Sequence, residues 1–229
     1  MNPKRAMLAV GAVVAALAVP AWADAEEVLC GPPGEEVPAT IVGAGTIVGT
    51  DGDDVIVGSP GDDTIDAGRG NDIICAGAGN DIVGGGPGDD LMAGDALDST
   101  PFLPSNGHND DHLSGGPGND EIVGFGGNDT LDGGPGDDAL IGMGGNDAIS
   151  GATGDDTAFG GPLDDVINGG HGNDVLWGNF GSDVINGGAG DDFIDGDNPD
   201  PSQPPFPPGS NVDTCNGGPG DNIVDHCEQ

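Results

Sequence analysis

The sequence predicts an all-β protein built as a stack of short repeated coils. Three observations predict this class. A nine-residue unit recurs through most of the chain, with aspartate at its sixth position and an apolar residue at its eighth. The first six positions are rich in Gly, Asn and Asp, which form turns, and the last three suit a short strand. One inward-facing apolar residue per unit makes a core too thin for a unit to fold alone, so the copies must stack.

The units, called nonads below, stay in register from residue 49 to residue 225, and we count about 17 of them. Two insertions of twelve residues, near 96–107 and 198–209, interrupt the repeat. After them the register resumes at Asp111 and at Asp213. We interpret both insertions as loops that leave a continuous stack, with no domain boundary at either.

The ends of the chain differ from the repeat. Residues 1–23 combine a basic start, an apolar run and a small-x-small sequence, Ala21 to Ala23, which predicts a secretory signal peptide and an extracellular mature protein. Residues 24–48 keep the apolar register but have Gly45 where aspartate is expected, so we interpret them as an N-terminal cap without metal. Residues 226–229 form a short tail.

The charge of the chain restricts its partners. Without residues 1–23, Arg69 is the only basic residue against 41 acidic ones. This excess of negative charge excludes nucleic acid as a partner, and no further segment is apolar enough for membrane insertion. Such a chain repels itself and has few aromatic residues with which to form a core. Either it stays disordered, or cations from solution allow it to fold.

The position-6 aspartates indicate which cation. Two nonads form one 18-residue coil, so position 6 of one nonad lies above position 6 of the next nonad but one, about 4.8 Å away. Stacked carboxylates at this distance repel each other unless a cation lies between them. Ca²⁺ suits carboxylate and carbonyl oxygens, whereas Mg²⁺ requires a tighter octahedron and zinc prefers the His and Cys that the repeat lacks.

The nonads GGPGNDEIV, GGPGDDALI and GGHGNDVLW fit the pattern GGxGxDxUx, where U is a large apolar residue. In this the chain resembles the RTX, or haemolysin-type calcium-binding, nonapeptide repeat family over residues 49–225. The resemblance implies a right-handed parallel β-roll in which multiple Ca²⁺ ions bind between turns two nonads apart. The ligands that it implies are Asp54, Asp63, Asp72, Asp81, Asp90, Asp111, Asp120, Asp129, Asp138, Asp147, Asp156, Asp165, Asp174, Asp183, Asp192 and Asp213, with backbone carbonyls of turn glycines such as Gly116, Gly118, Gly134, Gly136, Gly170 and Gly172.

Some positions depart from this pattern. Leu163 occupies position 4, where glycine supplies a positive φ, so we expect strain in its turn. Position 5 alternates Asp and Asn, which either adds ligands or only faces solvent. Members of the family commonly leave the cell through an exporter that reads a C-terminal signal, and the N-terminal signal peptide predicted here puts that route in doubt.

The four cysteines are an even number in a chain predicted to be exported, which favours disulfides. Three pairings are possible. We expect Cys30 with Cys75 and Cys215 with Cys227, because each pair would tie one end of the chain to its nearest repeats.

No HExxH, GxSxG or P-loop sequence occurs, and the repeats leave no room for a catalytic domain, so we expect no enzymatic activity. His108 and His112 lie four residues apart, but turn formers surround them and solvated histidines are the simpler interpretation; His171 and His226 are interpreted likewise. An ice-binding roll would need a row of Thr and Asn in its turns, which is absent.

The sequence therefore predicts a secreted calcium-binding protein that folds on export. The alternative is a structural or adhesive spacer at a cell surface or in an extracellular matrix, whose insertions make the contacts through Phe102, Leu103 and Phe206. The sequence does not specify a protein or cell-surface partner.

Overall fold

The computed structural model describes residues 29–30, 37–95, 109–197 and 213–227. These residues form a parallel β-solenoid of about eight coils and contain no helix, as the repeat predicts. Nothing in this described part is a helix that could cross a membrane. The predicted signal peptide (1–23) and both insertions (96–107 and 198–209) lie outside the described residues, as do most of residues 24–36 and the last two residues of the tail.

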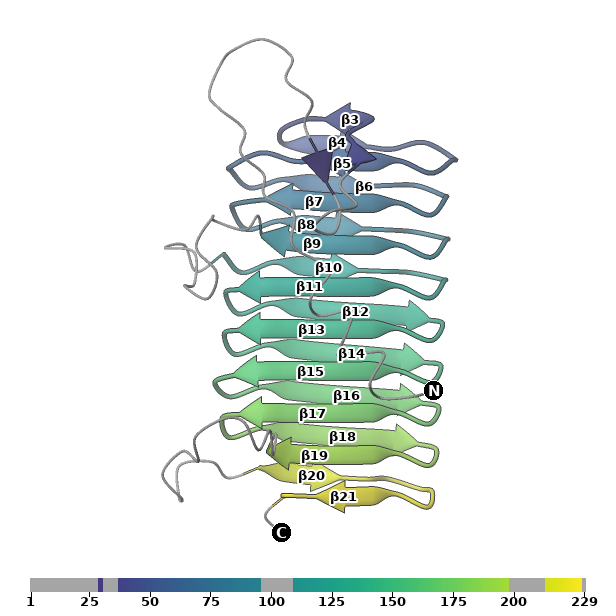
Figure 1. Ribbon diagram of the computed structural model, residues 1–229, viewed down its shortest axis with the longest axis vertical. Coiled ribbons are helices and arrows are strands. Elements are labelled where there is room, and N and C mark those ends of the chain that lie inside the picture. Colours follow the sequence, from purple (N-terminus) through teal and green to yellow (C-terminus); the bar gives the residue numbers. More distant parts are fainter. Residues whose placement is uncertain (1–28, 31–36, 96–108, 198–212, 228–229) are drawn as a thin grey trace.

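Two parallel sheets form the two faces of the solenoid (Figure 1). Even-numbered strands form one sheet, the even sheet, in the order β20-β18-β16-β14-β12-β10-β8-β6-β4, and odd-numbered strands form the other, the odd sheet, in the order β21-β19-β17-β15-β13-β11-β9-β7-β5-β3. A short antiparallel pair, β1 with β2, precedes them. The strands are β1 (Leu29–Cys30), β2 (Val37–Pro38), β3 (Ile41–Val42), β4 (Thr46–Val48), β5 (Val55–Val57), β6 (Thr64–Asp66), β7 (Ile73–Gly77), β8 (Ile82–Gly84), β9 (Leu91–Asp95), β10 (His112–Ser114), β11 (Glu121–Gly126), β12 (Thr130–Pro135), β13 (Ala139–Gly144), β14 (Ala148–Thr153), β15 (Thr157–Pro162), β16 (Val166–His171), β17 (Val175–Phe180), β18 (Val184–Ala189), β19 (Phe193–Asp197), β20 (Thr214–Asn216) and β21 (Ile223–Asp225).

Each coil advances the chain by two nonads. Leu131 of β12 pairs with Ile149 of β14, and Ile149 pairs with Ile167 of β16, so the same position of the repeat recurs on neighbouring strands. The register is kept across the first insertion, because Leu113 of β10 pairs with Val83 of β8. The chain is therefore one continuous stack on both sides of that insertion. The right-handed sense of the coil and the count of 17 nonads stay predictions.

The central strands are longer than the repeat predicts. We expected strands of three residues at positions 7 to 9, but β11 to β18 each span six residues. The first three positions of the following nonad extend the strand, and the pairs Gly134↔Ala152 and Pro135↔Thr153 continue the ladder there. A turn in each central nonad is therefore confined to positions 4 to 6.

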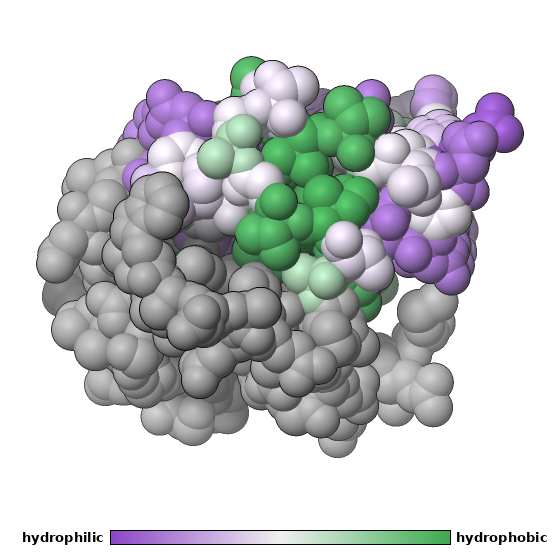
Figure 2. Space-filling view, turned by 90° about the horizontal axis from the view of Figure 1, so that it is seen from above, coloured by the Kyte–Doolittle hydropathy of each residue, from purple (hydrophilic) through white to green (hydrophobic). Residues whose placement is uncertain are grey.

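The hydrophobic core is a ladder one side chain wide. Position-8 residues from Ile47 to Ile194 are at most 5% exposed and form one continuous cluster. The ends of the ladder are less well covered. Figure 2 shows hydrophobic residues gathered on the N-terminal end of the roll, where Val42 and Val48 are exposed. At the other end the position-8 residue Val224 is 43% exposed.

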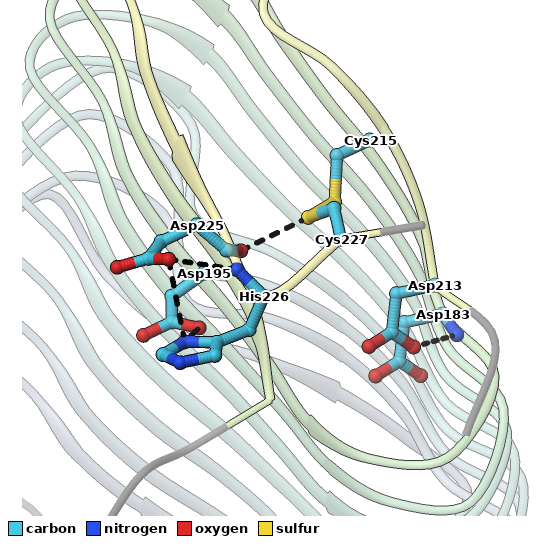
Figure 3. Close-up of a disulfide and its surroundings, with 7 residues drawn as sticks. All are labelled: Asp183, Asp195, Asp213, Cys215, Asp225, His226 and Cys227. Atoms are coloured by element: carbon cyan, nitrogen blue, oxygen red, sulfur yellow. Dashed lines mark hydrogen bonds and ion pairs between the residues drawn. A yellow bond between two sulfur atoms is a disulfide. The ribbon is translucent and has the colours of Figure 1, made fainter. Parts of the chain in front are cut away.

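A disulfide covers part of the C-terminal end. Cys215 and Cys227 are bonded, as predicted (Figure 3), and both pack against the core cluster. Cys75 is also disulfide-bonded, but the side chain of Cys30, its predicted partner, lies outside the described residues.

Neighbouring residues of β18 allow a test of this core. Ile185 is 1% exposed and Val184 is 48% exposed. We expect Ile185→Ala to lower the free energy of unfolding by about 2–5 kcal/mol, because the cavity that it leaves cannot be filled from a core one residue wide. Val184→Ala should change it by less than about 0.5 kcal/mol. Urea unfolding in calcium buffer measures both, and equal effects would contradict a core made by position 8.

Candidate metal centre

The predicted ligands form two buried rows, one along each edge of the roll where the turns lie. Each position-6 aspartate ends a turn and directly precedes a strand, so the strand pairing holds its backbone in place. All sixteen predicted aspartates are buried, with exposed fractions between 0% and 6%. Burial of so many acidic side chains requires partners for them, since an ionised carboxylate away from water is unstable alone.

Along each row, Oδ1 of a position-6 aspartate accepts a hydrogen bond from the backbone N–H of the position-6 aspartate in the preceding coil. The backbone N–H of Asp120 donates to Oδ1 of Asp138 at 2.8 Å, and the N–H of Asp138 donates to Oδ1 of Asp156 at 2.9 Å. The same bond joins Asp183 to Asp213 beside the C-terminal disulfide (Figure 3). Position 6 of one nonad therefore lies beside position 6 of the next nonad but one, which is the stacking that the sequence predicts.

The other carboxylate oxygen, Oδ2, is buried and accepts no hydrogen bond in most of the position-6 aspartates, which we call the position-6 ladder. This group comprises Asp72, Asp81, Asp90, Asp111, Asp120, Asp129, Asp138, Asp147, Asp156, Asp165, Asp174 and Asp192. A buried polar atom without a partner is destabilising and rare in folded proteins, and here it recurs at one position of a repeat. A regular row of such atoms indicates a ligand that binds between the turns.

The space around Oδ2 is lined by a second oxygen. At Gly142, position 1 of its nonad, an added Cβ would lie 2.3 Å from Oδ2 of Asp147 and 2.8 Å from the carbonyl oxygen of Gly160, one coil further. The carboxylate and the carbonyl thus converge on space that only glycine leaves open. Carboxylate and carbonyl oxygens together form the donor set that Ca²⁺ prefers. The residues present fit a hard divalent cation.

Position 1 lies beside the unpartnered oxygens but was not among the predicted site residues. The predicted carbonyl donors Gly116, Gly118, Gly134, Gly136, Gly170 and Gly172 lie at positions 2 and 4. In the structure these positions have positive φ and stack closely on the preceding coil; a Cβ on Gly136 would lie 1.5 Å from the carbonyl oxygen of Gly118. Their role as ligands stays a prediction. The signal for position 1 was available, since it is glycine in all nine nonads from residue 115 to residue 195.

The first two predicted sites differ from the others. Oδ2 of Asp54 accepts hydrogen bonds from the N–H and the hydroxyl of Thr50, at 2.7 and 2.9 Å. Oδ2 of Asp63 accepts one from the N–H of Ser59 at 2.5 Å, and its Oδ1 accepts one from the N–H of Gly45. Because the chain itself supplies these donors, the ladder of unpartnered oxygens begins at Asp72.

Side chains alone do not complete a metal site. Within residues 37–95, 109–197 and 213–227, no three His, Cys, Asp or Glu side chains converge on one point. A cation in the turns therefore needs backbone carbonyls as well as carboxylates. His112 is exposed on β10, and His108 lies outside the described residues.

Burial raises the pKa of the ladder carboxyls. Removal from water is the main cause; the hydrogen bond from the neighbouring amide lowers each value, and nearby carboxylates on adjacent coils raise it again. The pKa rises to about 8 for Asp111 and Asp165, to about 7 for Asp120, Asp129 and Asp156, and to about 6 for Asp81, Asp90, Asp138, Asp147 and Asp174. Without a cation, these groups take up protons near neutral pH.

Position 5 forms a second ladder, which runs in the opposite direction. The N–H of Asn173 donates to Oδ1 of Asp155 in the preceding coil at 2.8 Å, and the N–H of Asp155 donates to Oδ1 of Asp137 at 2.9 Å. These side chains are exposed, as one of the two sequence interpretations held. Their hydrogen bonds join neighbouring coils, a role that was included neither in the prediction of ligands nor in that of solvent-facing residues.

Two further sequence expectations can be compared with the structure. Leu163 has φ of 86°, so its turn adopts the strained conformation that we expected at position 4. His226 is exposed, as expected for a solvated residue, but its Nδ1 also lies 2.9 Å from Oδ1 of the buried Asp195 (Figure 3). The disulfide at Cys227 brings the tail back to β19, which the nonad pattern could not indicate.

Comparison with protein families agrees with this geometry. The model of the RTX calcium-binding nonapeptide repeat matches residues 48–83, 76–100, 107–140, 123–158, 132–167, 141–176 and 159–194, more than half of the chain. The chain belongs to the RTX calcium-binding nonapeptide repeat family. RTX repeats bind calcium through Asp-rich turns, and RTX proteins are typically extracellular. No curated protein matches the chain.

Two glycines at position 4 of the RTX repeat test the turn packing. A Cβ on Gly136 would collide with the preceding coil, whereas one on Gly52 meets nothing within 4 Å. We expect Gly136→Ala to lower the midpoint of thermal unfolding in calcium by several degrees, and Gly52→Ala to leave it nearly unchanged. Circular dichroism measures both midpoints. A tolerated Gly136→Ala would contradict the close stacking of the turns.

The raised pKa values predict how pH affects the chain after metal removal. An unfolded aspartate has a pKa near 3.9, so the folded chain binds protons more tightly. This stabilisation is full below about pH 4 and is lost as the pH rises through about 6 to 8. We therefore expect dialysed, metal-free protein to show more strand signal by circular dichroism at about pH 5 than at about pH 8.

Salt provides the control for that measurement. Added NaCl screens repulsion between exposed carboxylates but affects buried ones much less. The difference between the two pH values should persist in about 0.5 M NaCl. An equal or larger strand signal at the higher pH would show that the buried carboxyls do not hold protons.

Proposed function

We propose that this chain is an exported calcium-binding protein without enzymatic activity, whose turns bind several Ca²⁺ ions and whose folding depends on them. One observation carries the proposal: the buried Oδ2 atoms that accept no hydrogen bond, in twelve of the position-6 aspartates between Asp72 and Asp192. In a protein that folds without cations, each of these unpartnered buried oxygens would destabilise the fold, so their repetition along two edges favours a bound cation.

The position-6 aspartates would hold the ions together with backbone carbonyls of the turns. In each rung Oδ1 is occupied by the amide of the preceding coil, so Oδ2 is the oxygen left for a cation. Glycine at position 1 admits the second oxygen, the carbonyl of position 1 one coil further. Asp54 and Asp63 differ from the rest of the predicted set, because turn donors already bind both of their carboxylate oxygens.

The charge of the chain couples binding to folding. Arg69 is the only basic residue outside residues 1–23, and 41 acidic residues repel one another when the chain is compact. Bound calcium supplies two positive charges per ion at the most crowded carboxylates. Ten or more such sites would stabilise the fold strongly at millimolar calcium, and far less at the low calcium of a cytoplasm.

Export follows from the same argument. Residues 1–23 have the sequence of a signal peptide, and folding outside the cell would follow the rise in calcium concentration. The adhesive alternative depends on Phe102, Leu103 and Phe206, which lie outside the described residues, and it stays a prediction.

Adjacent aspartates of one turn provide the decisive experiment. Asp156 is buried in the position-6 ladder, and Asp155 is exposed in the position-5 ladder. Asparagine keeps the amide bond of position 6, because Oδ1 of Asn222 accepts the N–H of Asp192 at 2.8 Å in the native chain. Asp156→Asn thus removes the charge of Oδ2 but keeps the ladder.

We expect isothermal titration to show about one fewer calcium ion bound by Asp156→Asn, or a weakened site, and no loss for Asp155→Asn. Circular dichroism of wild-type protein should show strand signal with calcium and little at neutral pH with chelator. Equal calcium binding by both variants would reject position 6 as the ligand, and full strand signal in chelator would reject the coupling to folding.

A further inference from the structure

The outer face of the even sheet carries no acidic residue over its last four strands. The strands β14, β16, β18 and β20 contain no Asp, Glu, Lys or Arg, whereas Asp66 of β6 and Asp132 of β12 lie earlier in the same sheet. These four strands lie side by side at the C-terminal half of the roll (Figure 1). A face without Asp, Glu, Lys or Arg, on which His171 is the titratable side chain, is unexpected in a chain with 41 acidic residues. It can bind ligands that the acidic turns would repel.

A shallow groove of about 590 Å³ lies on this face. Polar position-9 side chains, Ser150, Asn168, Asn186 and Asn216, form one side of it. Small residues such as Gly170 and Gly188 lie along it at position 2 and leave its floor open. The groove therefore runs along the roll axis, from strand to strand. Equivalent residues line it once in every coil.

The asparagines present hydrogen-bonding groups at this repeat. Nδ2 of Asn186 donates to Oδ1 of Asn168 at 2.9 Å, and Oδ1 of Asn216 accepts the N–H of Gly218 at 3.1 Å. Within the described part of the chain, no protein hydrogen bond occupies Nδ2 of Asn168, Oδ1 of Asn186 or Nδ2 of Asn216. The groove thus offers two donors and one acceptor, about 4.8 Å apart along the axis.

An exposed apolar row flanks the asparagines. Val166 and Val184, at position 7 of β16 and β18, are 53% and 48% exposed, and Ala148 of β14 continues the row. The even sheet therefore presents apolar and amide rows in parallel. Sugar rings have the same division, with C–H groups on their faces and hydroxyl groups at their edges.

We propose that this groove binds a neutral polysaccharide chain, which lies along the roll axis with hydroxyl groups on the asparagine row and C–H faces on the valine row. An anionic polymer is disfavoured because the acidic turns on both edges of the roll repel it. A cationic ligand would bind those turns instead of the neutral face. An apolar ligand would leave the amide groups without partners.

The test uses full-length mature protein in calcium buffer and a panel of neutral hexasaccharides: cellohexaose, laminarihexaose, maltohexaose and chitohexaose. Isothermal titration should show that at least one of them binds with a Kd of about 1 mM or below. The double substitution Asn168→Leu with Asn186→Leu should weaken that binding at least about tenfold, since it removes the groups that contact hydroxyls.

A matched pair of asparagines is the control. Asn128 and Asn146 are also exposed and stacked one coil apart, with the N–H of Asn146 donating to Oδ1 of Asn128, but they lie in the turns. Asn128→Leu with Asn146→Leu should leave sugar binding within about twofold. Circular dichroism confirms that each variant folds. If the groove variant does not, Val166→Glu with Val184→Glu, both exposed, should abolish binding in its place.

Three results would overturn the proposal. The first is that no hexasaccharide binds at several millimolar. The second is that both asparagine pairs weaken binding equally, which would place the site elsewhere. The third is that hexagalacturonate, an anionic probe, competes with the neutral sugar, which would assign binding to calcium in the turns.

Discussion

Stacking of buried position-6 carboxylates is the interaction on which the rest of the structure depends. The hydrophobic core is one side chain wide, so each coil buries little apolar surface and cannot offset the repulsion of the acidic turns. The turns must therefore be stabilised where the charge is greatest. The amide of each aspartate binds one oxygen of the next rung, and the second oxygen remains for a cation. A mainly electrostatic arrangement thus replaces the thick core of a globular domain.

Glycine makes this arrangement possible, but for different reasons at different positions. At position 4 the turn needs a left-handed backbone and close contact with the preceding coil, as at Gly136. At position 1 the constraint is the aspartate of the same nonad, because a Cβ on Gly142 would occupy the space beside Asp147 Oδ2. The exposed position-5 ladder joins the same turns from outside. The composition that suggests disorder is therefore what lets the turns pack and bind.

The two sheets share one repeat but have different outer faces. Positions 7 and 9 point away from the core ladder, and their residues vary from copy to copy. The odd sheet gathers apolar residues there, with Phe159 stacked on Trp177 at 4.5 Å. The even sheet has a groove without acidic residues over β14 to β20, with an asparagine row on β16, β18 and β20. The two outer faces therefore differ between the sheets, while the turns and the core ladder repeat along the whole roll.

The sequence by itself determined the all-β stack, the core ladder and the buried row from Asp54 to Asp213, because a strict nine-residue period leaves one geometry in which every copy has the same neighbours. It also indicated the Cys215–Cys227 bond, since that pair closes one end. Only the tertiary structure decided which carboxylate oxygen stays available, that Thr50 and Ser59 satisfy the first two aspartates, and that His226 returns to Asp195. These features depend on contacts between coils and on the ends of the stack, where the period no longer specifies the neighbour.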